Sequence, residues 1–348
     1  MKPLYQEMLT KLGFSAFTPV QAAVIPVLDK HQSVVVTSQT GSGKTLSFLM
    51  PMVQHLENND RLQAIIISPT KELADQLLTE ARKLQAIKLF TLGSFTGGSV
   101  PKTTKMNVLV GTPGKLEDVL VKQNTYDLRH VKMLFIDEAD MTLDAGFLKS
   151  VDQVAGRLPK TLQMGVFSAT IPKGLQPFLK RYLNNPQVIN IEKNTLELTH
   201  QLYRVNPAKR LQNLVELVSS LQPFVGMIFC NTKQDVIMVK EAIEAHVENV
   251  AMVHGDIPAR ARKQMMRRIK DHEFQFVVCS DIAARGIDIP DVSHVINYQF
   301  PKDLSFYTHR AGRTGRIGKT GIVISLFDSK EEGIIQALQQ QGVKFEKR

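Results

Sequence analysis

Two short motifs in this chain carry the residue types needed to bind and hydrolyse a nucleoside triphosphate. The first, Ser38–Thr45, is a glycine-rich turn that follows the β-branched run Ser33–Thr37. Backbone N–H groups of such a turn, and of the helix that starts after it, bind phosphate oxygens. Lys44 supplies a positive charge, and the Thr45 hydroxyl is an oxygen ligand of the kind that Mg²⁺ prefers. The expected phosphate-binding residues are Ser38, Gln39, Thr40, Gly41, Ser42, Gly43, Lys44 and Thr45.

The second motif, Asp137–Asp140, follows the apolar run Val131–Ile136. Parallel sheets bind ligands at the carboxyl ends of their strands, where these carboxylates would lie. Asp137 could hold Mg²⁺ through water, and Glu138 could orient an attacking water or accept its proton. Taken alone, the first motif is also typical of an ordinary strand–helix turn, and the second of a solvated helix start. Their order on two predicted strands favours hydrolysis of a nucleoside triphosphate.

Composition indicates a two-domain protein with an affinity for polyanions. The chain has 348 residues and a formal net charge of +10, with 21 basic and 15 acidic residues in 1–190 and 22 and 18 in 191–348. Such a balance favours nucleic acid as a partner, although a basic protein without one is the alternative. No apolar run approaches the roughly 20 residues of a membrane span, so we expect no membrane contact. Cys230 and Cys279 lie in apolar runs, as small core residues of a cytoplasmic protein do.

Strand-like runs alternate with helical patterns along the whole chain, which predicts an α/β protein with parallel sheets. The strands expected in the first half are Val34–Thr37, Ala64–Ser68, Val108–Val110, Leu134–Ile136 and Met164–Phe167. Those expected in the second half are Gly226–Cys230, Val250–Val253, Phe276–Cys279, His294–Asn297 and Ile322–Phe327. The segment Asn184–Thr199 is polar and contains Pro186. We therefore expect a first domain over 1–190, a linker over 191–206 and a second domain over 207–348.

From Gly13 to Phe327 the chain resembles the DEAD-box RNA helicases of helicase superfamily 2, on short blocks that follow the family's order. The blocks are Gly13-Phe14 with Thr18–Gln21 (Q motif), Ser38–Thr45 (I), Pro69–Leu73 (Ia), Gly97-Gly98, Thr112–Lys115 (Ib), Asp137–Asp140 (II), Ser168–Thr170 (III), Ile228–Thr232 (IV), Ser280–Asp288 (V) and His309–Arg316 (VI). The resemblance implies two tandem RecA-like domains joined by a flexible linker, with ATP and Mg²⁺ as cofactors.

The resemblance also implies roles around ATP. Phe14 and Gln21 would recognise adenine, and Asp288 would contact the ribose hydroxyls. Gly286 would also belong to the nucleotide-binding site. Phosphoryl transfer builds charge on the γ-phosphate, which arginines from a second domain can stabilise. Arg313 and Arg316 would do so when the domains close, with a solvated basic turn as the alternative. His309 would then contact Asp140, while Ser168 and Thr170 would couple hydrolysis to strand separation.

RNA contacts are expected from loops that follow strands, where small side chains and N–H groups can approach phosphates. The candidates by resemblance are Pro69, Thr70, Lys71, Gly97, Gly98, Thr112, Gly114, Lys115, Asn231, Thr232, Arg262, Ser280 and Asp281. Lys71 and Lys115 stand where the family usually has arginine, and Ala259 where it often has glutamine. The chain has no tryptophan and no aromatic platform for bases, so binding should be independent of sequence. The segment Ala259–Lys270 has six basic and no acidic residues, which is also typical of a solvated helix face.

These observations predict a monomeric, RNA-stimulated ATPase that closes two domains on ATP and RNA and opens short duplexes locally. Two alternatives stay open: an ATP-gated RNA clamp or chaperone that does not unwind, and a DNA-directed motor of the same superfamily. The family's upstream aromatic, which stacks on adenine, would lie before the first residue of this sequence, so we expect it to be either missing or cut off. We therefore expect a lower nucleotide affinity than is usual in the family, and do not assign that role to Tyr5.

Overall fold

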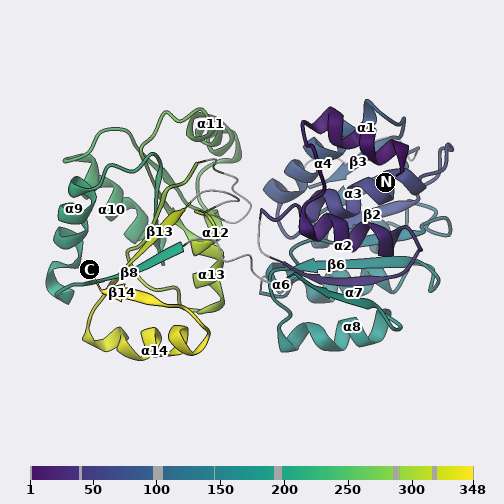
Figure 1. The fold of residues 1–348 in the computed structure, drawn as a ribbon. Helices are drawn as coiled ribbons and strands as arrows, with labels where there is room; N and C mark the ends of the chain where they lie inside the picture. Colours follow the sequence, from purple (N-terminus) through teal and green to yellow (C-terminus); the bar gives the residue numbers. More distant parts are fainter. Residues whose placement is uncertain are drawn as a thin grey trace. The chain divides into compact units, whose positions relative to one another are not determined.

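The chain divides into two compact α/β units, Met1–Asn194 and Thr195–Arg348 (Figure 1). The computed structural model describes all residues except 1, 39–40, 97–104, 145, 192–197, 285–288, 290, 316–319 and 348. Within the described residues, each unit contains a seven-stranded sheet in which every strand pair is parallel. The predicted fold class, two parallel-sheet α/β domains in tandem, is confirmed.

The first unit has a sheet that is covered by helices on both faces. Its strands, in the order β3-β4-β2-β5-β6-β1-β7, are β1 (Val34–Thr37), β2 (Ala64–Ile67), β3 (Leu92–Phe95), β4 (Val108–Gly111), β5 (Met133–Ile136), β6 (Gln163–Ser168) and β7 (Gln187–Asn190). Its helices are α1 (Pro3–Leu12), α2 (Pro19–Leu28), α3 (Lys44–His55), α4 (Lys71–Gln85), α5 (Pro113–Leu116), a π-helix (Glu117–Lys122), α6 (Ala139–Asp144), α7 (Leu148–Ala155), a 3₁₀-helix (Lys173–Leu175) and α8 (Gln176–Tyr182).

Alternating side chains explain why apolar runs form these central strands. Val34 and Val36 pack into a core with α1 to α4, whereas Val35 packs into a second core with α5 to α8. On β2, Ile66 likewise packs into the first core and Ile65 into the second. A strand buried on both faces needs apolar residues at successive positions, as parallel strands of α/β proteins do.

The second unit repeats this architecture. Its strands, in the order β10-β11-β9-β12-β13-β8-β14, are β8 (Leu198–Arg204), β9 (Gly226–Cys230), β10 (Val250–Val253), β11 (Phe276–Ser280), β12 (His294–Asn297), β13 (Gly321–Phe327) and β14 (Phe345–Lys347). Its helices are a 3₁₀-helix (Pro207–Lys209), α9 (Arg210–Ser220), α10 (Lys233–Glu244), α11 (Ala259–Lys270), α12 (Asp281–Ala284), α13 (Ser305–Ala311), a 3₁₀-helix (Ser329–Glu331) and α14 (Glu332–Gln340). Cys230 and Cys279 are buried, unlinked thiols on the neighbouring strands β9 and β11.

All ten predicted strands are present, but four strands of the structure were not predicted. Three of them, β3, β7 and β14, lie at sheet edges, and β8 lies beside β14. The predicted linker over 191–206 was wrong where it includes Leu198–Arg204, because these residues form β8 and pair with β13 and β14. This strand is mostly half-buried and rich in polar residues, so it lacks the apolar run that marked the central strands.

The parallel topology brings the predicted motifs of the first unit to one edge of its sheet. Strands β4, β2, β5, β6 and β1 are consecutive neighbours, and each is followed by one of the predicted blocks. Because the strands share one direction, the blocks after them all lie at the carboxyl edge. The fold therefore gathers residues that are more than a hundred positions apart in the chain.

Candidate functional site

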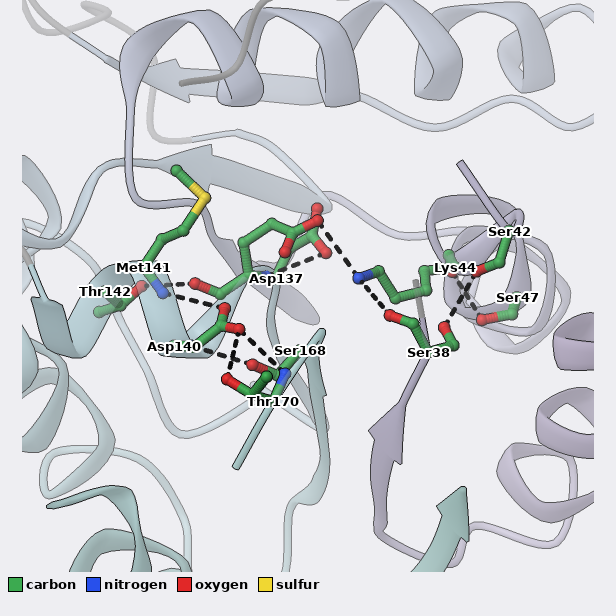
Figure 2. Close-up of polar contacts among 11 residues, drawn as sticks. Ser38, Ser42, Lys44, Ser47, Asp137, Asp140, Met141, Thr142, Ser168 and Thr170 are labelled. Carbon is green, nitrogen blue, oxygen red and sulfur yellow. Dashed lines mark hydrogen bonds and ion pairs between the residues drawn. The ribbon is translucent and has the colours of Figure 1, made fainter. Parts of the chain in front are cut away.

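Lys44 lies at the turn between β1 and α3, close to the carboxylate of Glu138. Its Nζ donates a hydrogen bond to the Ser38 carbonyl over 3.0 Å (Figure 2). The same Nζ lies 3.3 Å from Glu138 Oε1. Only 5% of the Lys44 side chain is exposed. The residue before it, Gly43, has a φ of +95°, and a Cβ there would lie 2.7 Å from Nε2 of Gln21. Glycine is thus required for the turn that places this ammonium group.

The two carboxylates that follow β5 are buried and incompletely paired. Glu138 has a φ of +47°, which is rare for a residue other than glycine. Its Oε2 is buried and has no hydrogen-bond partner in the described part of the chain. Burial, reinforced by the neighbouring charge of Glu138, raises the pKa of Asp137 to about 7, although Lys44 acts in the opposite direction. Such a pair favours a cation and a polar molecule beside it, because a buried unsatisfied oxygen is costly.

Asp140 joins the acidic motif to the end of β6. Its backbone N–H donates to Ser168 Oγ over 3.0 Å, and its Oδ2 accepts bonds of 3.0 Å from both the N–H and the hydroxyl of Thr170 (Figure 2). Its Oδ1 accepts from the N–H of Met141, also over 3.0 Å. The predicted coupling residues are therefore in direct contact. The expected approach of His309 to Asp140 involves both units and stays a prediction.

Gln21 connects the start of α2 to the glycine-rich turn. Thr18 caps α2, and its backbone N–H donates to Gln21 Oε1 over 3.0 Å. Nε2 of the same side chain donates to the Gly43 carbonyl over 3.3 Å. Gln21 thus lies beside the predicted phosphate-binding turn, while its contact with adenine stays a prediction. Phe14 is 51% exposed at the end of α1, whereas the Tyr5 ring is buried and its hydroxyl donates to Asp29.

The candidate RNA contacts of the first unit come from two neighbouring loops. Ile67 of β2 and Gly111 of β4 are paired in register, so the segments that follow them start side by side. The Thr70 hydroxyl accepts from the N–H of Leu73 and caps α4. Lys71 and Lys115 are exposed; Thr70, Thr112 and Gly114 are half-buried; Pro69 is buried.

Arg310 is the centre of a buried hydrogen-bond network in the second unit. Its Nε and Nη2 donate to the two oxygens of Asp281, each over 2.6 Å. Nη2 also donates to Asn231 Oδ1 over 3.0 Å, and Nη1 donates to Asn297 Oδ1 and the Gln299 carbonyl over 3.0 and 2.7 Å. All five N–H groups of the guanidinium are thereby satisfied. The network connects α13 to the ends of β9, β11 and β12.

This arrangement changes the interpretation of two predicted RNA contacts. The side-chain oxygens of Asn231 and Asp281 bind Arg310, so both residues hold the carboxyl edge of the second sheet together. Sequence reasoning considered Arg310 only as part of a basic turn and did not identify Asn297. A polar residue inside the apolar run His294–Asn297 was the available signal, because buried amides need hydrogen-bond partners.

The remaining candidates of the second unit lie around the same edge. The Thr232 hydroxyl caps α10 by accepting from the N–H of Asp235 over 3.1 Å. Ser280 ends β11 and is half-buried. The N–H of Arg313 donates to the Arg310 carbonyl over 3.0 Å, so the network of Arg310 also fixes the turn that carries Arg313. Seven predicted residues lie outside the described residues: Gln39, Thr40, Gly97, Gly98, Gly286, Asp288 and Arg316.

Two further features are absent from the residues that the structure describes. These residues contain no group of three or more His, Cys, Asp or Glu side chains arranged to hold a metal ion. Among them, no helix has the length and apolar character needed to cross a membrane.

Comparison with known proteins finds relatives that match along almost the whole chain. Residues 18–178 match the DEAD/DEAH box helicase family, and residues 209–318 match the helicase conserved C-terminal domain. DEAD-box ATP-dependent RNA helicase CshB of Listeria monocytogenes is 39% identical, over 99% of this chain and 82% of the relative. CshB of Bacillus subtilis is 37% identical over the same shares. The solved structure of S. cerevisiae Dbp5 bound to RNA and ADP BeF3 is similar with a TM-score of 0.89 and 27% identity, over 100% of this chain and 94% of that one.

Proposed function

Because the chain belongs to the family of DEAD-box ATP-dependent RNA helicases, we propose that it binds RNA without sequence preference and opens short duplexes locally, driven by ATP hydrolysis. Its two parallel-sheet units are the RecA-like domains of that family. The observation that carries the proposal is the cluster of Lys44, Asp137 and Glu138. A buried lysine beside two buried carboxylates, one of them with an unsatisfied oxygen, suits phosphate, metal and attacking water together.

In the proposed reaction, the first unit binds the triphosphate and prepares the water. Lys44 holds the phosphates and neutralises their charge, as a positioned cation does in phosphoryl transfer. Glu138 orients the attacking water and accepts its proton. Thr45 and Asp137 would hold Mg²⁺, which would offset the negative charge of the phosphates when bound. The unsatisfied Oε2 of Glu138 and the raised pKa of Asp137 support this fit, since both indicate negative charge without enough compensation.

The second unit would complete the site when ATP and RNA are both bound. Arg313, and Arg316 after it, would stabilise the charge that develops on the γ-phosphate. The hydrogen-bond network of Arg310 supports the role of Arg313, because it fixes the backbone of the turn that carries Arg313. Hydrolysis should then be slow without RNA, since the arginines would reach the γ-phosphate only when RNA is bound as well.

RNA is the proposed activator, bound mainly through its phosphates and 2′-hydroxyl groups. The relative Dbp5 has been solved with RNA and ADP BeF3, and its fold matches this chain. The proposed contacts are the loops after β2 and β4, in particular the half-buried Thr70 and the exposed Lys71 and Lys115, because the two strands before these loops are paired in register. We place the reaction in the cytoplasm, because both cysteines are buried, unlinked thiols.

The first test is steady-state ATP hydrolysis without nucleic acid, with single-stranded RNA, and with DNA of the same sequence. We expect strong stimulation by RNA and little by DNA. Equal rates in all three samples would contradict the proposal, and stimulation by DNA alone would favour a DNA-directed motor. Displacement of a short RNA strand from a duplex, with and without ATP, then separates unwinding from an ATP-gated clamp. A clamp would retain the duplex despite RNA-stimulated hydrolysis.

A further inference from the structure

Helix α11 carries the whole excess of positive charge of the second unit. The unit, residues 195–348, has 21 basic and 17 acidic residues, and six of the basic ones lie on α11 with no acidic residue among them. Outside this helix, acidic residues outnumber basic ones by 17 to 15. The affinity of this unit for polyanions should therefore be local rather than a general property of its surface.

Four of the cations form one exposed stripe along the helix. Arg260, Lys263, Arg267 and Lys270 follow one another at intervals of three or four residues, which places them on one side of an α-helix. All four are exposed. The other side of the helix faces the core, where Ile269 is buried among apolar side chains. At about 1.5 Å per residue, the stripe extends over roughly 15 Å. We call these four residues the basic stripe.

The basic stripe is largely unpaired within the described residues. Arg260, Lys263 and Lys270 form no ion pair there, and Arg267 reaches Asp271 only at 3.7 Å while 86% of its side chain is exposed. A pair that is so exposed holds its charges weakly. Arg268, in contrast, is occupied by Glu273 at 2.7 Å and by the ring of Phe274. The stripe therefore presents its charge to solvent.

Helix stability accounts for only part of the basic stripe. Cations in the last turn of a helix are favoured by its dipole, which explains Arg267 and Lys270. Arg260 lies in the first turn, where the dipole disfavours a positive charge, and this turn has no acidic residue. A charge kept at an unfavourable position suggests that it is needed for contact with an anion.

The position of α11 indicates which anion. Nη2 of Arg262, on the same helix, donates to the Ala283 carbonyl over 2.9 Å. This contact joins α11 to α12, which directly follows the predicted RNA contact Ser280. We propose that the basic stripe binds the sugar–phosphate backbone of RNA beyond the segment that the predicted loop contacts hold. This inference rests on the proposed RNA-dependent function and extends it to longer RNA.

The test compares two variants of the full chain that lose the same charge. The stripe variant changes all four stripe residues to glutamine, and the control variant changes four exposed lysines elsewhere in the unit. Its substitutions are Lys209→Gln, Lys302→Gln, Lys330→Gln and Lys344→Gln. Binding of single-stranded RNA of graded length is measured between about 50 and about 200 mM salt. Each lost phosphate contact lowers the salt slope by about 0.7, so the stripe variant should lose about 2 to 3 on long RNA.

We expect the loss on long RNA only, with short RNA bound equally by both variants and the wild type. The same slope for the stripe variant and the wild type at every length would overturn the proposal, as would an equal loss in the control variant. ATP hydrolysis by the wild type reports separately on the proposed function. If RNA binds through the basic stripe but does not stimulate hydrolysis, the proposed function is wrong, whereas RNA binding by the basic stripe is supported. If RNA stimulates hydrolysis while the stripe variant and the wild type have the same salt slope, only the proposed role of the basic stripe is wrong.

Discussion

At the scale of single residues, Glu138 combines a strained backbone with a side chain that faces Lys44. One carboxylate oxygen lies 3.3 Å from the lysine, and the other is buried without a partner. Replacement by glutamine preserves the shape but removes the ability to accept a proton. We expect Glu138→Gln to bind ATP and RNA but to hydrolyse ATP about 10² to 10⁴ times more slowly, the usual contribution of a general base. Single-turnover hydrolysis and equilibrium nucleotide binding measure the two properties separately.

Lys44→Ala is the matched control for this prediction. It removes the partner of Glu138 and the proposed phosphate ligand together, so nucleotide binding itself should weaken. If Glu138→Gln hydrolysed ATP at the rate of the wild type, the role assigned to Glu138 would be wrong. If both variants lost nucleotide binding equally, Glu138 would act in binding rather than in catalysis.

The sequence was informative about which residues matter and less informative about their partners. Lys44, Asp137 and Glu138 could be found because chemistry requires those types after a strand. Arg310 could not, because its five acceptors lie at or just after the ends of three strands whose spatial order a single sequence does not specify. For the same reason, Asn231 and Asp281 were predicted as RNA contacts before their occupied side chains were known.

At the scale of elements, Asp29 links α1 to α2 and α3 of the first unit through side-chain contacts. It ends α2, accepts from the Tyr5 hydroxyl, and lies 3.0 Å from Lys2 and 3.1 Å from His55 on α3. Burial alone would raise its pKa, but the hydrogen bonds from Tyr5, Lys2 and His55 outweigh burial, so the pKa lies below the usual 3.8. A lowered pKa means that the carboxylate stabilises the folded state above this value.

We therefore expect Asp29→Asn to lower the free energy of unfolding by about 1 to 2 kcal/mol at pH 7. The difference from the wild type should shrink as the pH falls below about 4, and it should vanish only below the lowered pKa of Asp29 in the folded state, where the wild-type carboxyl is protonated as well. Thermal unfolding at pH 7 and pH 3 measures this. Asp60→Asn is the control, since Asp60 pairs with Lys105 on the surface, where such pairs contribute little. A difference as large at pH 3 as at pH 7 would show that the charge is not the cause.

The network of Arg310 connects three strand ends and one helix, so its loss should affect a whole sheet edge. Arg310→Lys keeps the charge but cannot reproduce the planar fork, which leaves buried acceptors unsatisfied. We expect unfolding of the second unit to need about 3 kcal/mol less, in the range for a broken buried ion pair. Urea unfolding of the full chain measures it, with Arg204→Lys on the exposed end of β8 as the control. Equal midpoints for both variants would contradict the structural role.

The elements that the sequence predicted and those that it missed differ in burial. Central strands such as β1 and β9 are buried on both faces, so their apolar runs were visible. The edge strand β7 is almost fully exposed, and its backbone pairing with β1 rather than its composition makes it a strand. Strand β8 was predicted as part of the linker because it is mostly half-buried and lacks an apolar run. Composition therefore predicts the interior of each sheet better than its margin.

At the scale of the whole molecule, the proposed mechanism needs residues from both units. Arg313→Ala should leave RNA binding without ATP unchanged, because the backbone of its turn is held by Arg310. The stimulation of hydrolysis by RNA should fall by about 10³ or more, as for other arginines that act on a γ-phosphate. ATP hydrolysis over a range of RNA concentrations measures both effects. The exposed Lys302→Ala is the control, and an unchanged stimulation in Arg313→Ala would refute the role of this arginine.

The position of the two cysteines gives each unit a different response to thiol reagents. They are the only cysteines of the sequence, and both lie on central strands of the second unit, where burial raises the pKa of Cys230 and raises that of Cys279 to about 12. A buried thiol with a high pKa reacts only after the surrounding structure opens. The rate of alkylation of the native chain thus records opening of the second sheet, without any label or mutation, while the first unit remains silent.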